Sequence, residues 1–197
     1  GVISIESFRE QNMEPLAILS LLATIGTSNS IELKKDIKQI IDEFKIETIS
    51  TSPGRIETDL LNALNKKLVQ SLNFIDIKDR LASVDSRIDE LFWNSVKGNL
   101  STVEDIKNWA DIVFNEDKID VEDKEFIKQA LSVIPAEPWD ENTWESWTAE
   151  IKELTGRKGK ELFLPLREAF TGMKHGPEMK QLIQLLGREK ILNRVNI

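Results

Sequence analysis

The side chains best suited to chemistry lie near the carboxyl end of the chain, where cations and helix ends come close together. The stretch 172–177 reads G-M-K-H-G-P and joins two predicted helices. A helix that begins at Pro177 leaves its first backbone N–H groups free and carries a partial positive charge there. These donors, beside Lys174 and His175, predict a binding site for a phosphate or for the polar edge of an exposed base.

Further cations flank this stretch. Arg167 lies on the preceding helix, and its guanidinium fork suits contacts with phosphates or bases. The alternative for Arg167 is a surface residue paired with a neighbouring acid. Lys158 and Lys160 belong to the run TGRKGK and, with Lys174, are predicted to attract phosphates without reading sequence. For His175, the only histidine, the alternative is an exposed loop residue with no contact.

The charge distribution favours an anionic partner. Residues 155–197 contain nine Lys or Arg and four Glu, a net charge of +5, whereas the whole chain is −8 and residues 1–154 are therefore −13. An acidic protein with one basic end usually directs that end toward something anionic.

Other chemistries lack the residues they need. The chain has no cysteine and one histidine, which excludes disulfides and thiolate zinc sites. It contains no G-x-x-x-x-G-K-[ST] phosphate loop, no G-x-G-x-x-G and no G-x-S-x-G elbow. The acidic run 115–123 lacks the glycine and the ligand spacing of a calcium loop. We therefore predict no catalytic, cofactor-binding or metal-binding residue in this chain.

The location of the protein follows from what its sequence lacks. No apolar run approaches the roughly 18 residues of a membrane span, and no secretory signal pattern opens the chain. We expect a cytoplasmic protein that does not enter a membrane.

The elements that must position these residues are mostly helices. Apolar spacing, caps and Gly or Pro stops predict helices at 15–25, 31–44, 55–72, 85–96, 101–114, 121–133, 142–154, 165–172 and 177–186. Leu164 precedes Pro165 and should be extended, so the helix is expected to begin at Pro165. Strand signals are confined to 2–5 and 46–49, and seams are predicted at Gly54 and at the polar stretch 73–85. The fold class is mainly α.

The five tryptophans could act as stacking platforms for bases. Trp93, Trp109, Trp144 and Trp147 fall at helical core spacing, so packing is favoured for these four. Trp139 lies outside a clear helix.

The run LFLPLREAFTGMKHGPEMKQLIQLLGREK resembles the C-terminal anticodon-binding end of bacterial glutamyl-tRNA synthetases. The early run SIESFREQNMEPLAILSLLATIGTS resembles the segment after that family's K-M-S-K-S-type loop, and FWNSVKGNL at 92–100 resembles its alphaproteobacterial branch. The resemblance implies a stem-contact region at 1–70, followed by a helical anticodon cage in two subdomains, 71–122 and 123–197.

The same resemblance assigns roles to single residues. It implies that Arg167 faces anticodon bases and that the helix start at Gly176, Pro177 and Met179 contacts the anticodon loop. At Gly176 that contact could come only from the backbone. Lys66 and Lys67 lie on the implied stem-contact helix, where they are either a solvated face or a tRNA backbone contact. These lysines therefore keep two interpretations.

Discrimination between two tRNAs stays open. Some members of the family read the third anticodon base with an arginine, but Leu91 and Phe92 occupy the corresponding region here. The resemblance therefore leaves undecided whether the partner is tRNA-Glu alone or also tRNA-Gln.

The resemblance implies the tRNA-binding and anticodon-recognition portion of a glutamate–tRNA ligase, which charges tRNA-Glu with glutamate using ATP. ATP and magnesium would belong to a catalytic domain outside this chain, so we expect the chain to be inactive alone. We also expect it to be a monomer. Two other interpretations remain. One is the anticodon cage of a class I lysyl-tRNA synthetase. The other is a helical protein-interaction module whose basic end binds an acidic partner.

Overall fold

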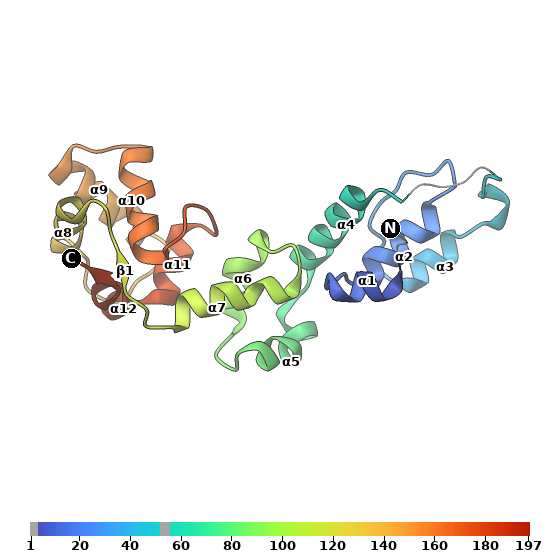
Figure 1. Cartoon of the computed structure of the whole chain (residues 1–197), viewed down its shortest axis with the longest axis horizontal. Coiled ribbons are helices and arrows are strands. Elements are labelled where there is room, and N and C mark those ends of the chain that lie inside the picture. Colours follow the sequence, from blue (N-terminus) through green and yellow to red (C-terminus); the bar gives the residue numbers. More distant parts are fainter. Residues whose placement is uncertain (1–3, 52–55) are drawn as a thin grey trace. The chain divides into compact units, whose positions relative to one another are not determined.

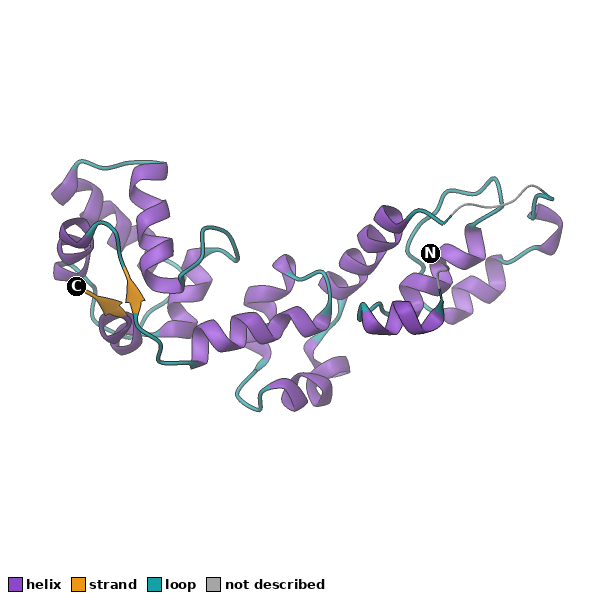
Figure 2. Ribbon diagram, viewed as in Figure 1, coloured by secondary structure: helices purple, strands orange, loops and turns teal. Residues whose placement is uncertain are grey.

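The computed structural model describes residues 4–51 and 56–197, and these residues are predominantly helical (Figures 1 and 2). They form twelve α-helices, three 3-10 helices and two strands of two residues each. The mainly α fold class predicted from the sequence is therefore confirmed. The chain divides into two compact units, Gly1–Arg87 with Lys97–Ile106, and Ile88–Val96 with Lys107–Ile197.

The first unit has its core between α2 and α4. Its elements are α1 (Ile5–Glu10), α2 (Pro15–Thr24), α3 (Ile37–Glu43), η1 (Ile46–Thr48), α4 (Thr58–Ser71), α5 (Phe74–Val84), η2 (Lys97–Asn99) and η3 (Val103–Asp105). Leu21 of α2 and Leu61 of α4 are both 1% exposed, and they share one apolar cluster with Phe8. Helical spacing places Leu61, Leu64 and Leu68 on one face of α4, so this face is the one that becomes buried.

A buried amide fixes the position of α4. Asn65 is 1% exposed. Its Oδ1 accepts a hydrogen bond from the backbone N–H of Glu14 at 2.7 Å, and its Nδ2 donates to the carbonyl of Ser101 at 2.8 Å. One side chain thus satisfies two backbone groups that lie far from it in sequence.

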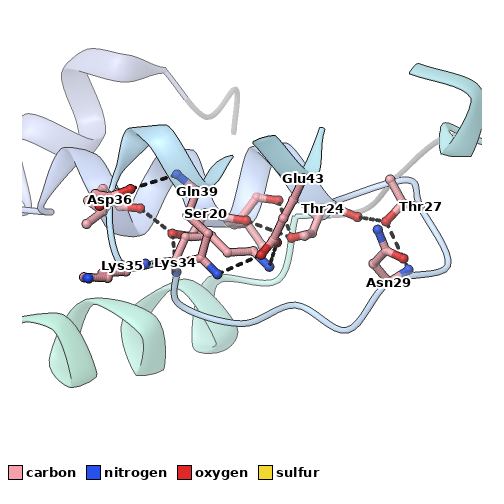
Figure 3. A network of polar contacts seen from close by, with 11 residues as sticks. Ser20, Thr24, Thr27, Asn29, Lys34, Lys35, Asp36, Gln39 and Glu43 are labelled. Carbon is pink, nitrogen blue, oxygen red and sulfur yellow. Dashed lines mark hydrogen bonds and ion pairs between the residues drawn. The ribbon is translucent and has the colours of Figure 1, made fainter. Parts of the chain in front are cut away.

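A polar network connects the segment 27–36 to α2 and α3 (Figure 3). The hydroxyl of Ser20 accepts from the backbone N–H of Lys34 at 3.0 Å, and Lys34 Nζ pairs with Glu43 at 2.6 Å. Glu43 also accepts from the Gln39 amide at 2.8 Å. The hydrogen bond from Lys34, with that from Gln39, lowers the pKa of Glu43. The network adds polar contacts to a connection whose Ile31 and Leu33 pack against the apolar cluster of this unit.

The second unit is built around stacked aromatic rings. Its elements are α6 (Glu90–Val96), α7 (Ile106–Phe114, from its second residue), β1 (Ile119–Asp120), α8 (Lys124–Ser132), α9 (Thr143–Thr155), α10 (Lys160–Thr171), α11 (Met179–Leu186), α12 (Arg188–Arg194) and β2 (Val195–Asn196). Trp147 of α9 stacks on Phe170 of α10 with 5.4 Å between ring centroids. The Trp147 indole N–H donates to the Ala130 carbonyl at 3.0 Å. β1 and β2 pair in parallel, with Ile119 opposite Val195.

The predicted break at Pro165 is wrong. Helix α10 is continuous from Lys160 to Thr171, with Pro165 inside it. Proline lacks the N–H that would bond to the carbonyl of Glu161, which costs helix stability. Leu162 and Leu166, at 2% and 0% exposure, bury the same helix face on either side of the proline. Tertiary packing therefore overrides the local preference at Leu164.

Other local predictions also need correction. The polar stretch 73–85 is not a seam, because it contains α5, which buries Leu81 completely. The predicted strand at 46–49 is the 3-10 helix η1, and Ile5 of the predicted strand 2–5 begins α1. Residues 2 and 3, together with Gly54 and the predicted helix start at residue 55, lie outside the described residues. Polar stretches can thus form helices when a few apolar positions recur at helical spacing.

The functional segments 1–70, 71–122 and 123–197 stay a prediction. They were assigned by expected contact with tRNA, whereas the two compact units are defined by internal packing.

Candidate nucleic-acid interface

The connection between α10 and α11 presents two of the predicted residues to solvent. Helix α10 ends at Gly172, which adopts a left-handed conformation (φ 71°) and donates its N–H to the Glu168 carbonyl at 2.8 Å. Lys174 and His175 follow, and both are exposed. Lys174 Nζ lies 3.5 Å from a Glu168 carboxylate oxygen, a loose and solvated pair. The loop therefore presents one lysine cation and one imidazole to solvent.

Arg167 lies in the third turn of α10 and points toward the same connection. Its Nη2 donates to the Pro177 carbonyl at 2.9 Å. Its Nη1 is buried and has no hydrogen-bond partner among the described residues. The neighbouring acids are engaged elsewhere, since Glu168 pairs with Lys174 and Glu178 pairs with Lys180. Arg167 is thus not the acid-paired surface arginine of the alternative interpretation.

Burial lowers the pKa of the Arg167 guanidinium. An arginine still remains charged at every physiological pH. A half-buried guanidinium with an unused donor is costly unless something supplies an acceptor. Arg167 therefore keeps a positive charge that no described carboxylate pairs with.

Arg167 borders a hollow of about 270 Å³. Its walls come from α9, α10 and the start of α11, and the lining residues are Trp144, Phe163, Arg167, Glu178, Met179 and Lys180. Phe163 is 45% exposed, which is unusual for a phenylalanine in an otherwise well-packed helix. The hollow combines flat apolar walls with a cation.

At the start of α11, most side chains are buried and cannot contact a ligand. Helix α11 begins at Met179, two residues later than predicted. The side chains of Pro177 and Met179 are buried, and Gly176 is half-buried against Trp109. Contacts from residues 176 and 177 to a ligand would therefore have to come from their backbone. The structure brings these residues together with Arg167 through the bond to Pro177.

The loop before α10 carries two further predicted cations. Lys158 and Lys160 are exposed, and no described carboxylate pairs with either. Between them and α9, Arg157 is held by contacts within the protein and is partly exposed: it pairs with Asp123 at 2.6 Å and lies 4.1 Å over the Phe126 ring. The hydrogen bond from Arg157 is the main cause that lowers the pKa of Asp123. This partly exposed pair fixes the loop in place, and both lysines project from it into solvent.

Lys66 and Lys67 belong to the first unit. Both are exposed on α4, on the side away from buried Leu64 and Leu68. Lys66 borders a hollow of about 380 Å³ with Asn65 and Ser101. This placement is compatible with both interpretations of the two lysines.

Several cations of the basic end act inside the protein. Arg194 is 4% exposed and donates to the carbonyls of Phe170, Ile112 and Asn115. Lys190 donates to the carbonyl of Val113 at 2.7 Å. These cations hold the carboxyl end of α7, where helix carbonyls lack internal partners. The net charge of +5 therefore overstates the charge that a ligand can meet.

The tryptophans divide between packing and the hollow. Trp93 and Trp147, at 0% and 1% exposure, are core residues as predicted, and Trp109 is 8% exposed. Trp144 is only half-buried and borders the hollow. Phe163 was missed entirely, although it precedes Arg167 by four residues. That spacing indicates one helix face, but the predicted break at Pro165 concealed it.

No group of three or more His, Asp or Glu side chains that could hold a metal occurs in residues 4–51 and 56–197. Over the same ranges, none of the helices has the length and apolar character needed to cross a membrane.

Comparisons with known proteins point in one direction. A family model described as "Anticodon binding domain" matches residues 65–197. Glutamate--tRNA ligase 1 of Chelativorans sp. (strain BNC1) is 40% identical over 98% of this chain and 44% of its own length. Glutamate--tRNA ligase 2 of Hyphomonas neptunium is 40% identical over 100% of this chain and 45% of its own length.

Solved structures agree on the fold. The glutamate-tRNA synthetase of Elizabethkingia anophelis superposes with a TM-score of 0.77 at 17% identity, over 95% of this chain and 41% of that protein. The chain spans less than half the length of the curated relatives it matches. These relatives are glutamate–tRNA ligases, so the interpretation as a lysyl-tRNA synthetase is not favoured.

Proposed function

Because this chain belongs to the anticodon-binding domain family, we propose that it is the portion of a glutamate–tRNA ligase that binds tRNA-Glu and inspects its anticodon loop. The whole protein would charge tRNA-Glu with glutamate at the expense of ATP. We place this activity in the cytoplasm and expect the chain to act as a monomer.

One observation carries the proposal beyond the family assignment. The guanidinium of Arg167 has no carboxylate partner among the described residues, and its buried Nη1 lacks an acceptor. Arg167 borders the hollow of about 270 Å³, and its planar guanidinium suits a phosphate oxygen or a base-edge acceptor placed there.

Recognition would divide between two kinds of contact. Exposed Lys158, Lys160 and Lys174 attract phosphates and position the tRNA without reading its sequence. Arg167 and the backbone near Pro177 inspect bases that leave the stack in the loop. His175, exposed beside Lys174, is a further candidate for a phosphate or base contact. On α4, Lys66 and Lys67 would contact the tRNA stem.

The chemistry of the ligase is proposed to lie outside the matched share of the relatives. The sequence has no phosphate-binding loop, and the described residues offer no cluster of metal ligands. We propose that ATP and magnesium bind in the part of the relatives that this chain does not match. We expect the purified chain neither to form glutamyl-adenylate nor to charge tRNA; detection of either product would contradict this expectation.

The test is equilibrium binding of the chain to tRNA-Glu over a salt series, beside a tRNA with substituted anticodon bases. We expect a preference for the native anticodon that persists as salt rises. Arg167→Ala should remove about 1–3 kcal/mol from binding and abolish the preference. Arg167→Lys is the matched control, because it keeps the charge and loses the planar fork.

The lysines have a different signature. Lys158→Ala with Lys160→Ala should lower the slope of log affinity against log salt by roughly 1 for each lysine removed. The anticodon preference should survive. Equal, steeply salt-dependent binding of both tRNAs by the wild-type chain would contradict anticodon reading. Indifference to RNA together with capture of an acidic protein would instead support the protein-interaction module.

A further inference from the structure

The connection between α10 and α11, residues 172–177, rests at both ends on side chains from α7 and β1. At Gly176, an added Cβ would stand 2.1 Å from Cη2 and 2.7 Å from Cζ2 of Trp109, so the backbone already touches the six-membered ring of the indole. At Gly172, an added Cβ would stand 3.9 Å from Cδ1 of Ile119, an ordinary van der Waals distance. All of these residues belong to the second compact unit. The path of the connection therefore depends on packing against α7 and β1.

The helix that carries Trp109 is itself held in place. Arg194 donates to the carbonyl of Ile112, and Lys190 donates to the carbonyl of Val113 at 2.7 Å. Both carbonyls lie within about one helical turn of Trp109, whose side chain is 8% exposed. A buried ring on a helix fixed in this way has few alternative positions, because protein interiors are closely packed.

The next residue of the connection makes contact with Arg167. The side chain of Pro177 is buried, and its carbonyl accepts a hydrogen bond from Arg167 Nη2 at 2.9 Å. This bond orients the guanidinium, with which no described carboxylate pairs. Because the guanidinium is a rigid plane, the direction of one N–H group fixes the directions of the others. A shift of the backbone at Gly176 would therefore move the Pro177 carbonyl and turn the plane of Arg167.

We propose that Trp109 is a positioning residue for anticodon recognition. Its six-membered ring holds the backbone of Gly176 and Pro177, and through the Pro177 carbonyl it sets the direction in which Arg167 meets the tRNA. Binding groups need such support, since they act well only when the residues around them fix their geometry. The inference rests on the proposed function and adds to it a buried residue that does not itself touch RNA.

The test removes the contacting atoms of the indole and keeps an aromatic core. Trp109→Phe retains a ring on α7 but lacks Cη2, Cζ2 and Cζ3, the three atoms that lie nearest to an added Cβ at Gly176. Ile127→Ala is the control, because Ile127 is 1% exposed on α8 and its truncation also removes apolar volume from the core of this unit. Circular dichroism and urea unfolding give the folded fraction of each variant, and affinities refer to that fraction.

Affinity is measured for tRNA-Glu and for a tRNA with substituted anticodon bases, using wild type, Trp109→Phe, Arg167→Ala and the double variant. We expect Trp109→Phe to weaken binding of tRNA-Glu by about threefold to thirtyfold, the range for residues that modulate a site without touching its ligand. It should bind the substituted tRNA within about twofold of wild type. In the Arg167→Ala background, Trp109→Phe should change neither affinity by more than about twofold, because the residue through which it acts is gone. Ile127→Ala should keep the anticodon preference of wild type.

The outcomes separate the positioning role from the proposed function. If wild type prefers the native anticodon and Trp109→Phe weakens both tRNAs equally, or neither, the positioning role is overturned and the function stands. The same loss of tRNA-Glu affinity with and without Arg167 also overturns it, since the ring then acts by another route. Loss of the preference in Ile127→Ala overturns it too, because destabilisation alone would then explain the effect. If wild type shows no preference for the native anticodon, both proposals fall.

Discussion

The backbone of Gly176 lies directly against the indole of Trp109. A Cβ added at Gly176 would stand 2.1 Å from Cη2 of that ring, a separation that real contacts do not reach. Gly176 also has a φ of +149°, a backbone conformation that residues other than glycine rarely adopt. Trp109 on α7 therefore packs against the connection between α10 and α11 and leaves no room for a side chain at position 176.

Gly176→Ala should destabilise the protein by at least about 2 kcal/mol, since it adds steric overlap to backbone strain. Urea unfolding measures the change. The overlap belongs to a pair, so Trp109→Ala combined with Gly176→Ala should cost less than the sum of the two single substitutions. Gly98→Ala is the control, because a Cβ there meets nothing within 4 Å. A double variant whose free-energy cost equals the sum of the two single costs would contradict the contact.

Asn65→Ala should cost about 2–4 kcal/mol in the first unit, because two backbone groups lose their partner inside the protein. These groups are the N–H of Glu14 and the carbonyl of Ser101. Denaturant unfolding is the measurement. Asn62→Ala, at an exposed position of the same helix, should change stability by less than about 0.5 kcal/mol. Similar costs at both positions would mean that the bridge contributes nothing.

Arg194→Met should cost about 2–4 kcal/mol, since the carbonyls of Ile112 in α7 and Phe170 in α10 lose the guanidinium as their donor. Arg194→Lys should fall between wild type and Arg194→Met, because one ammonium cannot reach the same set of acceptors. Chemical denaturation compares these with Lys128→Met, an exposed cation on α8. If Arg194 instead served the ligand, Arg194→Met would leave stability unchanged and weaken tRNA binding.

The pair Asp123–Arg157 should make stability depend on pH. The hydrogen bond from Arg157, and then the N–H of Phe126, lower the pKa of Asp123 in the folded state. The stabilisation is therefore complete above the unfolded pKa of about 3.9 and is lost as pH falls through the lower, folded pKa.

At pH 7, Asp123→Asn should unfold at a lower denaturant concentration than wild type, and the difference should shrink in acid. Unfolding series at neutral and acidic pH measure it. Arg157→Met removes the main cause that lowers the pKa of Asp123, so the stability of this variant should depend less on pH. A difference between wild type and Asp123→Asn that does not change with pH would rule out this linkage.

Local sequence was informative wherever one element decides its own structure. Pro15 at the first turn of α2 predicted where that helix begins, and the Leu61–Leu64–Leu68 spacing of α4 predicted its buried face. The polar stretch 73–85 misled because its few apolar residues become decisive only when Leu81 is buried. The helix predicted to begin at residue 101 begins instead at Ile106, after a 3-10 turn in which Asp105 accepts from the Thr102 N–H at 2.8 Å.

The sequence by itself determined the helical class, the basic carboxyl end and the family, because composition, periodicity and motif order are written along the chain. Only the tertiary structure decided which of those cations a ligand can meet. Arg194 is buried and donates to carbonyls, and Arg157 pairs with Asp123, whereas Arg167 has no carboxylate partner among the described residues and borders the hollow. It also decided that α10 continues through Pro165, which places Phe163 beside Arg167. The physical reason is that burial and long-range hydrogen bonds outweigh local preferences of about 1–3 kcal/mol, and those partners are distant in sequence.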